Sequence, residues 1–122
     1  MTAPTRVLVV DDDEDIRTVI ELTLARRGYE VLGAEDGIDA LEQLHADGSP
    51  SVILLDLRMP RMNGIEFLHA LRSDPALAQI PVVVLTGDSA AATQAMTAGA
   101  NGMLLKPIDT RSLFRSIEPY VS

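Results

Sequence analysis

Five acidic residues stand in succession at positions 11–15, directly after the apolar run VLVV at 7–10. Neighbouring carboxylates repel one another, and desolvating them at the end of a buried strand is costly unless a cation is close. These acids are therefore either solvated residues at a helix start or ligands for a metal ion. We predict that Asp11 and Asp12 bind a divalent cation. Asp13, Glu14 and Asp15 are predicted to begin a helix, where each acid contributes about 0.3 to 1 kcal/mol through the helix dipole.

Three more polar residues close apolar runs later in the chain, namely Asp56, Thr86 and Lys106. If they meet the acidic pair, the carboxylate oxygens suit a hard cation such as Mg²⁺. An aspartate beside Mg²⁺ can act as a nucleophile that accepts a phosphoryl group. The metal, the ammonium of Lys106, and the Thr86 hydroxyl with backbone N–H groups around Gly87 would then neutralise the phosphoryl oxygens.

Short apolar runs that look like buried strands alternate with segments of helical period. The predicted strands lie at 7–10, 29–34, 51–56, 81–86 and 102–106. Three predicted helices contain residues 16–24, 38–44 and 65–71. A fourth lies over 89–99, and a fifth lies near 110–118. This alternation predicts parallel pairing, right-handed crossovers and helices on both faces of the sheet. We expect an open, doubly wound (βα)5 domain of the α/β class. Ligands of such sheets bind outside the carboxyl ends of the strands, where the polar residues named above all fall.

The sequence marks the first helix clearly and the fourth helix weakly. The first is well marked, since a glycine follows at residue 28 and apolar residues recur at helical spacing: Ile16, Val19, Ile20 and Leu24. The segment 89–99 has Met96 as its one large apolar residue. We therefore expect the fourth helix to be the most loosely packed.

Composition narrows the range of functions. The chain has 122 residues, of which 47% are hydrophobic and 3% aromatic, and its net charge is −8. This excess of acids argues against direct nucleic-acid binding, which needs clustered Lys and Arg. Without cysteines there is no disulfide framework, and no apolar run approaches the roughly twenty residues that cross a membrane. We expect one cytoplasmic domain over 1–122, with no output domain and no membrane contact.

Four motifs occur in order along nearly the whole chain: VLVVDDDEDIR, LLDLRMPRMNG, VVVLTGD and MLLKPID. Together they closely resemble the receiver domains of two-component response regulators of the chemotaxis-regulator type. The resemblance implies a flavodoxin-like strand order 2-1-3-4-5. It also implies a phosphorylatable signalling switch that assists its own phosphorylation and dephosphorylation, rather than a metabolic enzyme.

The resemblance assigns roles to single residues. Asp56 would be phosphorylated by a histidine kinase or phosphotransfer protein, with Thr86 as the switch hydroxyl and Lys106 as the phosphate-contacting lysine. Mg²⁺ would be bound by carboxylates and by the backbone carbonyl of Arg58. The carboxylates are those of Asp11, Asp12 and Asp56. The peptide bond between Lys106 and Pro107 would be cis.

Three positions depart from or tune the usual pattern. Met103 stands where family members carry Tyr or Phe, so it is either a flexible readout residue or a passive core residue. Arg58 and Asp88 flank the site, and we hypothesise that their charges pair and prolong the phosphoryl state. The alternative is two solvated side chains. Signals would leave through the fourth helix, fifth strand and fifth helix, to a downstream effector or a dimer partner.

Other classes fit the residues less well. A phosphatase of the haloacid-dehalogenase type needs Asp-x-Asp-x-Thr or Val after its first strand, whereas Asp15 stands at the fifth place here. It also needs a cap and a longer chain. A flavodoxin-like FMN carrier needs a Thr- and Ser-rich phosphate loop after the first strand, which this sequence lacks. A degenerate receiver that only binds partners is disfavoured because Asp56, Thr86 and Lys106 are all present.

Overall fold

The computed structural model describes residues 5–59 and 61–121. Five strands and five helices alternate along the chain. They are β1 (Arg6–Val10), α1 (Glu14–Ala25), β2 (Glu30–Ala34), α2 (Gly37–Asp47), β3 (Val52–Asp56), α3 (Gly64–Ser73), β4 (Val82–Thr86), α4 (Ser89–Thr97), β5 (Gly102–Leu105) and α5 (Thr110–Val121). The strands form one parallel sheet in the order β2-β1-β3-β4-β5, which confirms the predicted doubly wound α/β fold.

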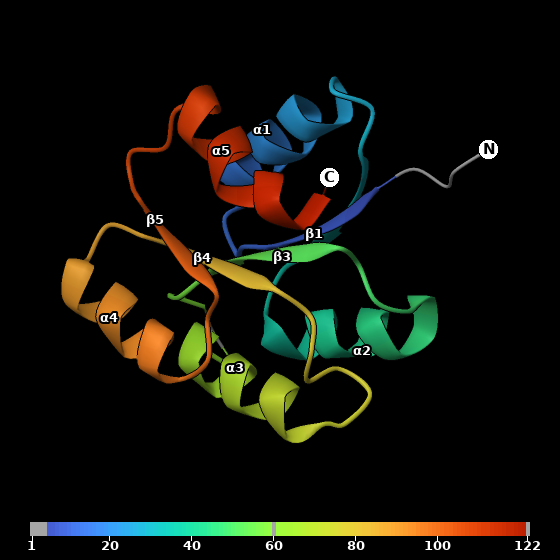
Figure 1. The fold of residues 1–122 in the computed structure, drawn as a ribbon, viewed down its shortest axis with the longest axis vertical. Helices are drawn as coiled ribbons and strands as arrows, with labels where there is room; N and C mark the ends of the chain where they lie inside the picture. The colour runs from blue at the N-terminus through green and yellow to red at the C-terminus, as the bar shows by residue number, and fades with distance from the viewer. Residues whose placement is uncertain (1–4, 60, 122) are drawn as a thin grey trace.

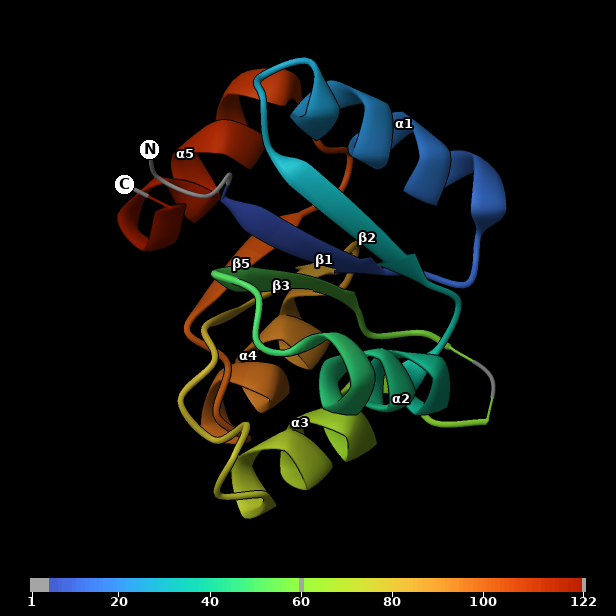
Figure 2. The ribbon, with the colours of Figure 1, turned by 90° about the vertical axis from the view of Figure 1, so that its right-hand side faces the viewer.

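Helices cover both faces of this sheet (Figures 1 and 2). α1 and α5 pack on one face, and α2, α3 and α4 pack on the other. Each face has its own aliphatic core, and the strand residues alternate between the two cores. On β3, for example, Leu54 belongs to the α1–α5 core, whereas Ile53 and Leu55 belong to the core beneath α2, α3 and α4. All three of these side chains are fully buried.

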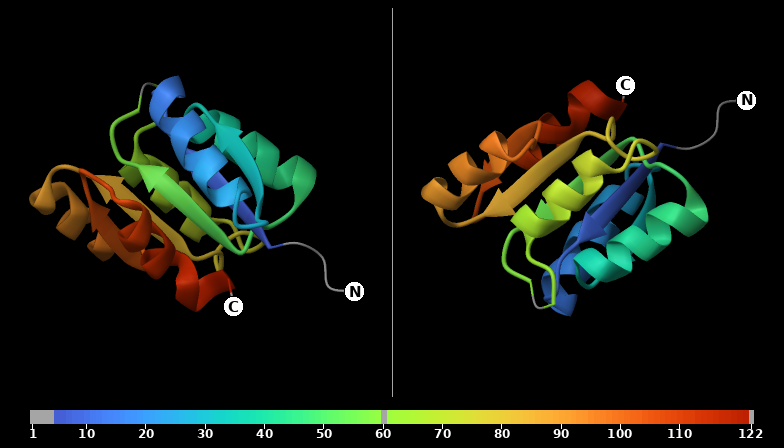
Figure 3. Two further views of the ribbon diagram at one scale, coloured as in Figure 1. Left: turned by 90° about the horizontal axis from the view of Figure 1, so that it is seen from above. Right: turned by 90° about the horizontal axis from the view of Figure 1, so that it is seen from below.

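The register brings the carboxyl ends of the central strands to one edge, as the views onto the two faces of the sheet show (Figure 3). Val10 on β1 pairs with Leu55 on β3, and Asp56 pairs with Leu85 on β4. Past the end of β5, the backbone N–H of Lys106 donates to the carbonyl of Thr86 at 2.9 Å. The polar residues that end β3 and β4, and those that directly follow β1 and β5, therefore lie at the same edge.

Polar side chains fix where the helices begin. The Asp13 carboxylate accepts hydrogen bonds from the N–H groups of Asp15 and Ile16 at 3.0 and 3.1 Å, so α1 starts after Asp13. Asn63 and Glu66 form a reciprocal capping box on α3. After α1 the backbone turns at Gly28, whose φ of 90° favours glycine. The acids assigned to a helix start from the sequence therefore do that work.

Two apolar patterns in the sequence do not correspond to the observed burial. Ile20 and Leu24 of α1 are buried, but Ile16 and Val19 are exposed, because the sheet covers only part of the apolar face. On α4 the buried residues are Ala92 and Ala95, not Met96, which is 40% exposed. Of these two, Ala95 belongs to the core beneath α2, α3 and α4, and the partly buried Ala91 packs against that core.

Two further points complete the fold. The peptide bond between Lys106 and Pro107 is cis, in agreement with the expectation from the family resemblance. Pro60 of the motif LLDLRMPRMNG lies outside the described residues. Within residues 5–59 and 61–121, every helix is too short or too polar to cross a membrane.

Candidate functional site

Three carboxylates meet at the carboxyl edge of the sheet. Asp11 follows β1, Asp12 comes next, and Asp56 is the last residue of β3. One oxygen from each lies within 4.8 Å of the others. Asp11 and Asp56 are buried and Asp12 is exposed, so the cluster opens to solvent on one side. The convergence expected from the sequence is therefore present.

The carboxylates of this cluster repel one another, and two of them are buried. Burial raises the pKa of Asp11 and of Asp56 above the ordinary value, and the neighbouring carboxylates add to this shift. Asp11 Oδ1 accepts a hydrogen bond from the N–H of Asp13 at 2.9 Å. Its Oδ2 is buried and has no hydrogen-bond partner among the described residues. A buried carboxylate oxygen without a partner, beside two more carboxylates, fits a hard divalent cation bound by oxygen ligands.

A cation from the protein reaches the same site. Lys106 Nζ lies 3.4 Å from Asp56 Oδ1, and its charge partly offsets the effect of burial on the pKa of Asp56. The backbone N–H of Arg58 also hydrogen bonds to the Asp56 carboxylate and lowers that pKa. Asp56 is thus the carboxylate that contacts a lysine, a backbone amide and two further acids.

Thr86 ends the neighbouring strand β4 and is buried. Its Oγ1 accepts a hydrogen bond from the N–H of Asp88 at 3.2 Å. Thr86 and Gly87 line a cavity of about 540 Å³ that holds the whole site. The cavity is lined by Asp11, Asp12, Asp13, Ile16, Asp56, Arg58, Thr86, Gly87, Asp88 and Lys106. An anion of phosphoryl size entering it would meet a lysine, a hydroxyl and a carboxylate nucleophile together.

The flanking residues differ from the expected pairing. Arg58 and Asp88 both line the cavity, yet among the described residues no ion pair joins them. The Asp88 carboxylate accepts from the N–H groups of Ala90 and Ala91 instead, and so caps α4. Met103 on β5 is 48% exposed, so it is not a buried core residue.

The four motifs did not indicate three contacts made by Arg17 and Arg61. Arg17 Nη1 donates to the carbonyl of Asp11 at 2.6 Å, and Arg17 also pairs with Glu21 at 3.4 Å. Arg61 Nε lies 2.6 Å from Asp36 Oδ2. The helical spacing of Arg17 and Glu21 could have indicated their pairing, because residues four apart are neighbours on a helix. The contact between Asp36 and Arg61 depends on the tertiary fold and had no local signal.

The fold and this site define a parallel α/β domain with an acidic, lysine-bearing pocket at the sheet edge. The sequence profile of the response regulator receiver domain matches residues 7–118. The chain therefore belongs to the response regulator receiver family, the phosphoacceptor signalling switches of two-component systems.

Individual relatives agree with this assignment. Chemotaxis protein CheY1 of Helicobacter pylori is 39% identical over 116 residues, which cover 93% of this chain and 94% of the relative. The structure of chemotaxis protein CheY4 of Vibrio cholerae has a TM-score of 0.89 at 33% identity, covering 97% of this chain and 99% of that one. A receiver domain of a Pseudomonas aeruginosa sensor histidine kinase, with a magnesium ion coordinated in its active-site cleft, has a TM-score of 0.88 at 28% identity. That match covers 98% of both chains.

Proposed function

We propose that Asp56 is the phosphoacceptor of this receiver, and that a histidine kinase or a phosphotransfer protein supplies the phosphoryl group. The observation that carries the proposal is the position of the Asp56 carboxylate. It lies 3.4 Å from the ammonium of Lys106 and within 4.8 Å of two other carboxylates, at the bottom of an open cavity. Among residues 5–59 and 61–121, the ion pair that Lys106 forms is with Asp56 and not with Asp11 or Asp12.

The transfer follows from these side chains. A carboxylate oxygen of Asp56 attacks the phosphorus of a phosphohistidine, the new O–P bond forms, and the P–N bond breaks. The electron pair of that bond stays on the imidazole nitrogen, which takes up a proton. Lys106 neutralises one phosphoryl oxygen, and the Thr86 hydroxyl with the N–H of Gly87 donates to another.

We propose that Asp11, Asp12, Asp56 and the backbone carbonyl of Arg58 hold Mg²⁺. The partnerless Oδ2 of Asp11 supports this choice. The bound ion would supply positive charge against the phosphoryl oxygens and relieve the repulsion among the carboxylates. The same residues would also promote dephosphorylation by water, as a receiver that controls its own lifetime requires. Arg58 and Asp88 line the mouth of the cavity, and we propose that both tune this step as separate side chains.

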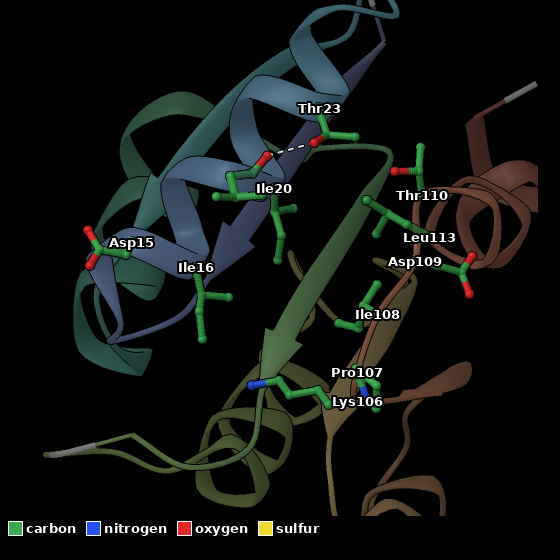
Figure 4. Close-up of a pocket in the computed structure, with 11 residues that line it drawn as sticks. Asp15, Ile16, Ile20, Thr23, Lys106, Pro107, Ile108, Asp109, Thr110 and Leu113 are labelled. Carbon is green, nitrogen blue, oxygen red and sulfur yellow. Dashed lines mark hydrogen bonds between the residues drawn. The ribbon is translucent and has the colours of Figure 1, made fainter.

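A groove beside the site suits the phosphoryl donor. It has a volume of about 390 Å³ and lies between α1 and the segment that leads from β5 into α5. Figure 4 shows Ile16 and Ile20 of α1 on one wall, opposite Ile108 and Leu113. Lys106 lines one end, so a helix docked on these apolar side chains would bring its phosphohistidine to Asp56.

The output surface is proposed to be α4, β5 and α5, since β5 is the edge strand and contacts both helices. Three large apolar side chains are exposed there, namely Met96, Met103 and Leu105. An effector or a second copy could bury them. Met103 would act as a flexible contact whose exposure changes with the position of Thr86. We also propose that the receiver is the only domain within residues 1–122, and that it acts in the cytoplasm, where kinases of this class use ATP.

Phosphorylation with acetyl phosphate and Mg²⁺, followed by intact mass measurement, tests the proposal. The wild type should gain the mass of one phosphoryl group, and Asp56→Ala should gain none. Glu14→Ala is the matched control, because it removes a nearby acid outside the cluster and should be phosphorylated normally. A wild type without added mass, or an Asp56→Ala variant that is still modified, would contradict the assignment.

A further inference from the structure

One ion pair outside the site joins two loops that follow different strands. Asp36 is 2% exposed and lies just after β2, where its Oδ1 accepts the N–H of Asp39 at 2.9 Å and so caps α2. Its Oδ2 accepts from Arg61 Nε at 2.6 Å. Arg61 lies between β3 and α3, and its hydrogen bond lowers the pKa of Asp36. A buried carboxylate of this kind needs its cationic partner, because an unpaired buried charge is strongly unfavourable.

The backbone at Arg61 indicates that this contact holds the loop in place. Its φ is 60°, and it is the one residue other than glycine with positive φ among residues 5–59 and 61–121. Long side chains rarely adopt this conformation without compensation. The pair with Asp36 is the compensating interaction that the structure offers.

The described residues of this loop, 57–59 and 61–63, are held at two places. At its base, the N–H of Gly64 donates to the carbonyl of Leu57 at 3.1 Å. At its far end, Met62 packs so closely on Gly37 that a Cβ on that glycine would lie 2.9 Å from the methionine Sδ. Arg61 and Met62 therefore tie the far end of the loop to the start of α2.

The same loop carries Arg58, whose backbone N–H hydrogen bonds to the Asp56 carboxylate. Its backbone carbonyl is the proposed fourth protein ligand of Mg²⁺. We propose that Asp36 and Arg61 are positioning residues that hold the loop between β3 and α3 in the conformation that binds Mg²⁺. This inference rests on the proposed function and extends it to two residues that touch neither the metal nor the phosphoryl group.

The expected effect is a loss of metal affinity without a loss of fold. Breaking the pair would let the loop leave its binding conformation for most of the time. The apparent affinity for Mg²⁺ is then the intrinsic affinity multiplied by the fraction of molecules whose loop is in the binding conformation. We expect the dissociation constant for Mg²⁺ to rise about threefold to tenfold. Saturating Mg²⁺ selects the competent loop, so the maximal rate of phosphorylation by acetyl phosphate should stay close to that of the wild type.

Two variants, one that removes a negative charge and one that removes a positive charge, distinguish loop positioning from a direct electrostatic effect on the metal ion. Asp36→Asn keeps the cap on α2 but loses the charge, and Arg61→Asn loses the cation while tolerating positive φ. A purely electrostatic effect would weaken Mg²⁺ binding in Asp36→Asn and strengthen it in Arg61→Asn. Positioning predicts weaker binding in both variants, with the double variant no weaker than the single ones.

Mg²⁺ titrations followed by NMR amide shifts, together with the Mg²⁺ dependence of the phosphorylation rate, supply the readouts. Arg6→Ala is the matched control, because it breaks another ion pair, with Glu30 at 3.2 Å, at the start of β1. Its Mg²⁺ affinity should equal that of the wild type. The inference is overturned if folded Asp36→Asn and Arg61→Asn bind Mg²⁺ within twofold of the wild type, or if their affinities shift in opposite directions. A wild type that neither binds Mg²⁺ nor accepts a phosphoryl group would instead refute the proposed function itself.

Discussion

Replacing Asp11 with Asn should make the metal-free protein more stable, because the three carboxylates of the site repel one another. Asn has nearly the same shape as Asp, and its Oδ1 can still accept the N–H of Asp13. Its Nδ2 would take the place of the buried Oδ2, which has no partner among the described residues. A repelling oxygen is thus exchanged for a hydrogen-bond donor that faces the carboxylates of Asp12 and Asp56.

The size of the effect follows from the distances. Two unit charges 4.8 Å apart repel by about 3.5 kcal/mol at an effective dielectric constant of about 20, and Asp11 takes part in two such pairs. Solvent at the open side and the lost attraction of Asp11 to Lys106 offset most of this sum. We therefore expect a net gain on the order of 2 kcal/mol in the free energy of unfolding. For a domain of this size that is an increase of about 8 °C in the melting temperature.

The pH must be near neutral in this experiment. The folded state raises the pKa of Asp11 and Asp56, so it binds protons more tightly than the unfolded state does. Metal-free stability therefore falls as the pH rises from the ordinary aspartate pKa through the raised values. The full destabilisation by these carboxylates is present only above the raised pKa values.

Thermal unfolding followed by circular dichroism, with EDTA and with millimolar Mg²⁺, provides the assay. Mg²⁺ should raise the melting temperature of the wild type by mass action and have little effect on Asp11→Asn. Glu14→Gln is the control, because this exposed acid lies outside the cluster and should lower stability by less than about 1 kcal/mol through the lost helix-dipole interaction. A metal-free Asp11→Asn that melts at or below the wild-type temperature would refute the reasoning, since the carboxylates would then not be in tension.

Three other predictions follow. Asp12→Ala should abolish Mg²⁺-dependent phosphorylation by acetyl phosphate, measured by intact mass, while Glu14→Ala should leave it almost unchanged. Because Arg61 lowers the pKa of Asp36, this carboxylate stabilises the fold above the ordinary aspartate pKa, and its contribution is lost as the pH falls through the lowered value. Urea unfolding of Asp36→Asn should therefore depend less on pH in the acid range than that of the wild type. Arg72→Met should reduce the unfolding free energy by about 2 to 4 kcal/mol, because three part-buried carbonyls lose their donor, while Mg²⁺ affinity stays the same.

The sequence predicted the sheet well because parallel strands buried on both faces read as continuous apolar runs. Each of the five runs corresponds to a strand, with ends that differ by at most one residue. The site was predictable for a related reason. A polar residue that closes such a run lies at the carboxyl edge, so Asp56, Thr86 and Lys106 had to converge once the strands paired in parallel.

Side-chain packing was harder to predict from the sequence, because the spacing of apolar residues does not show how much of a helix surface the sheet covers. Ile16 and Val19 have the spacing of core residues, yet they lie at the margin of the α1 contact and remain exposed. The ion pair of Asp36 with Arg61 joins residues 25 positions apart and involves a left-handed arginine, which no sequence rule favours. Arg72 reads as an ordinary surface residue of α3, although its guanidinium donates to carbonyls of two separate loops.

The expectation that α4 is the most weakly held helix has a different physical basis from the one inferred from Met96. Ala92 and Ala95 bury little apolar area, whereas α3 buries Phe67, Leu68 and Leu71, so a shift of α4 breaks fewer contacts. The start of α4 is also coupled to the site. Thr86 Oγ1 accepts the N–H of Asp88, and the Asp88 carboxylate caps α4. A Thr86 hydroxyl drawn toward a phosphoryl group on Asp56 would stretch this 3.2 Å contact. Asp88 would then either move with Thr86 or lose this hydrogen bond. The helix with the smallest buried side chains is thus the one whose first turn is connected, through Asp88, to the Thr86 hydroxyl. A small displacement of this hydroxyl would therefore be passed on to the surface that α4 forms.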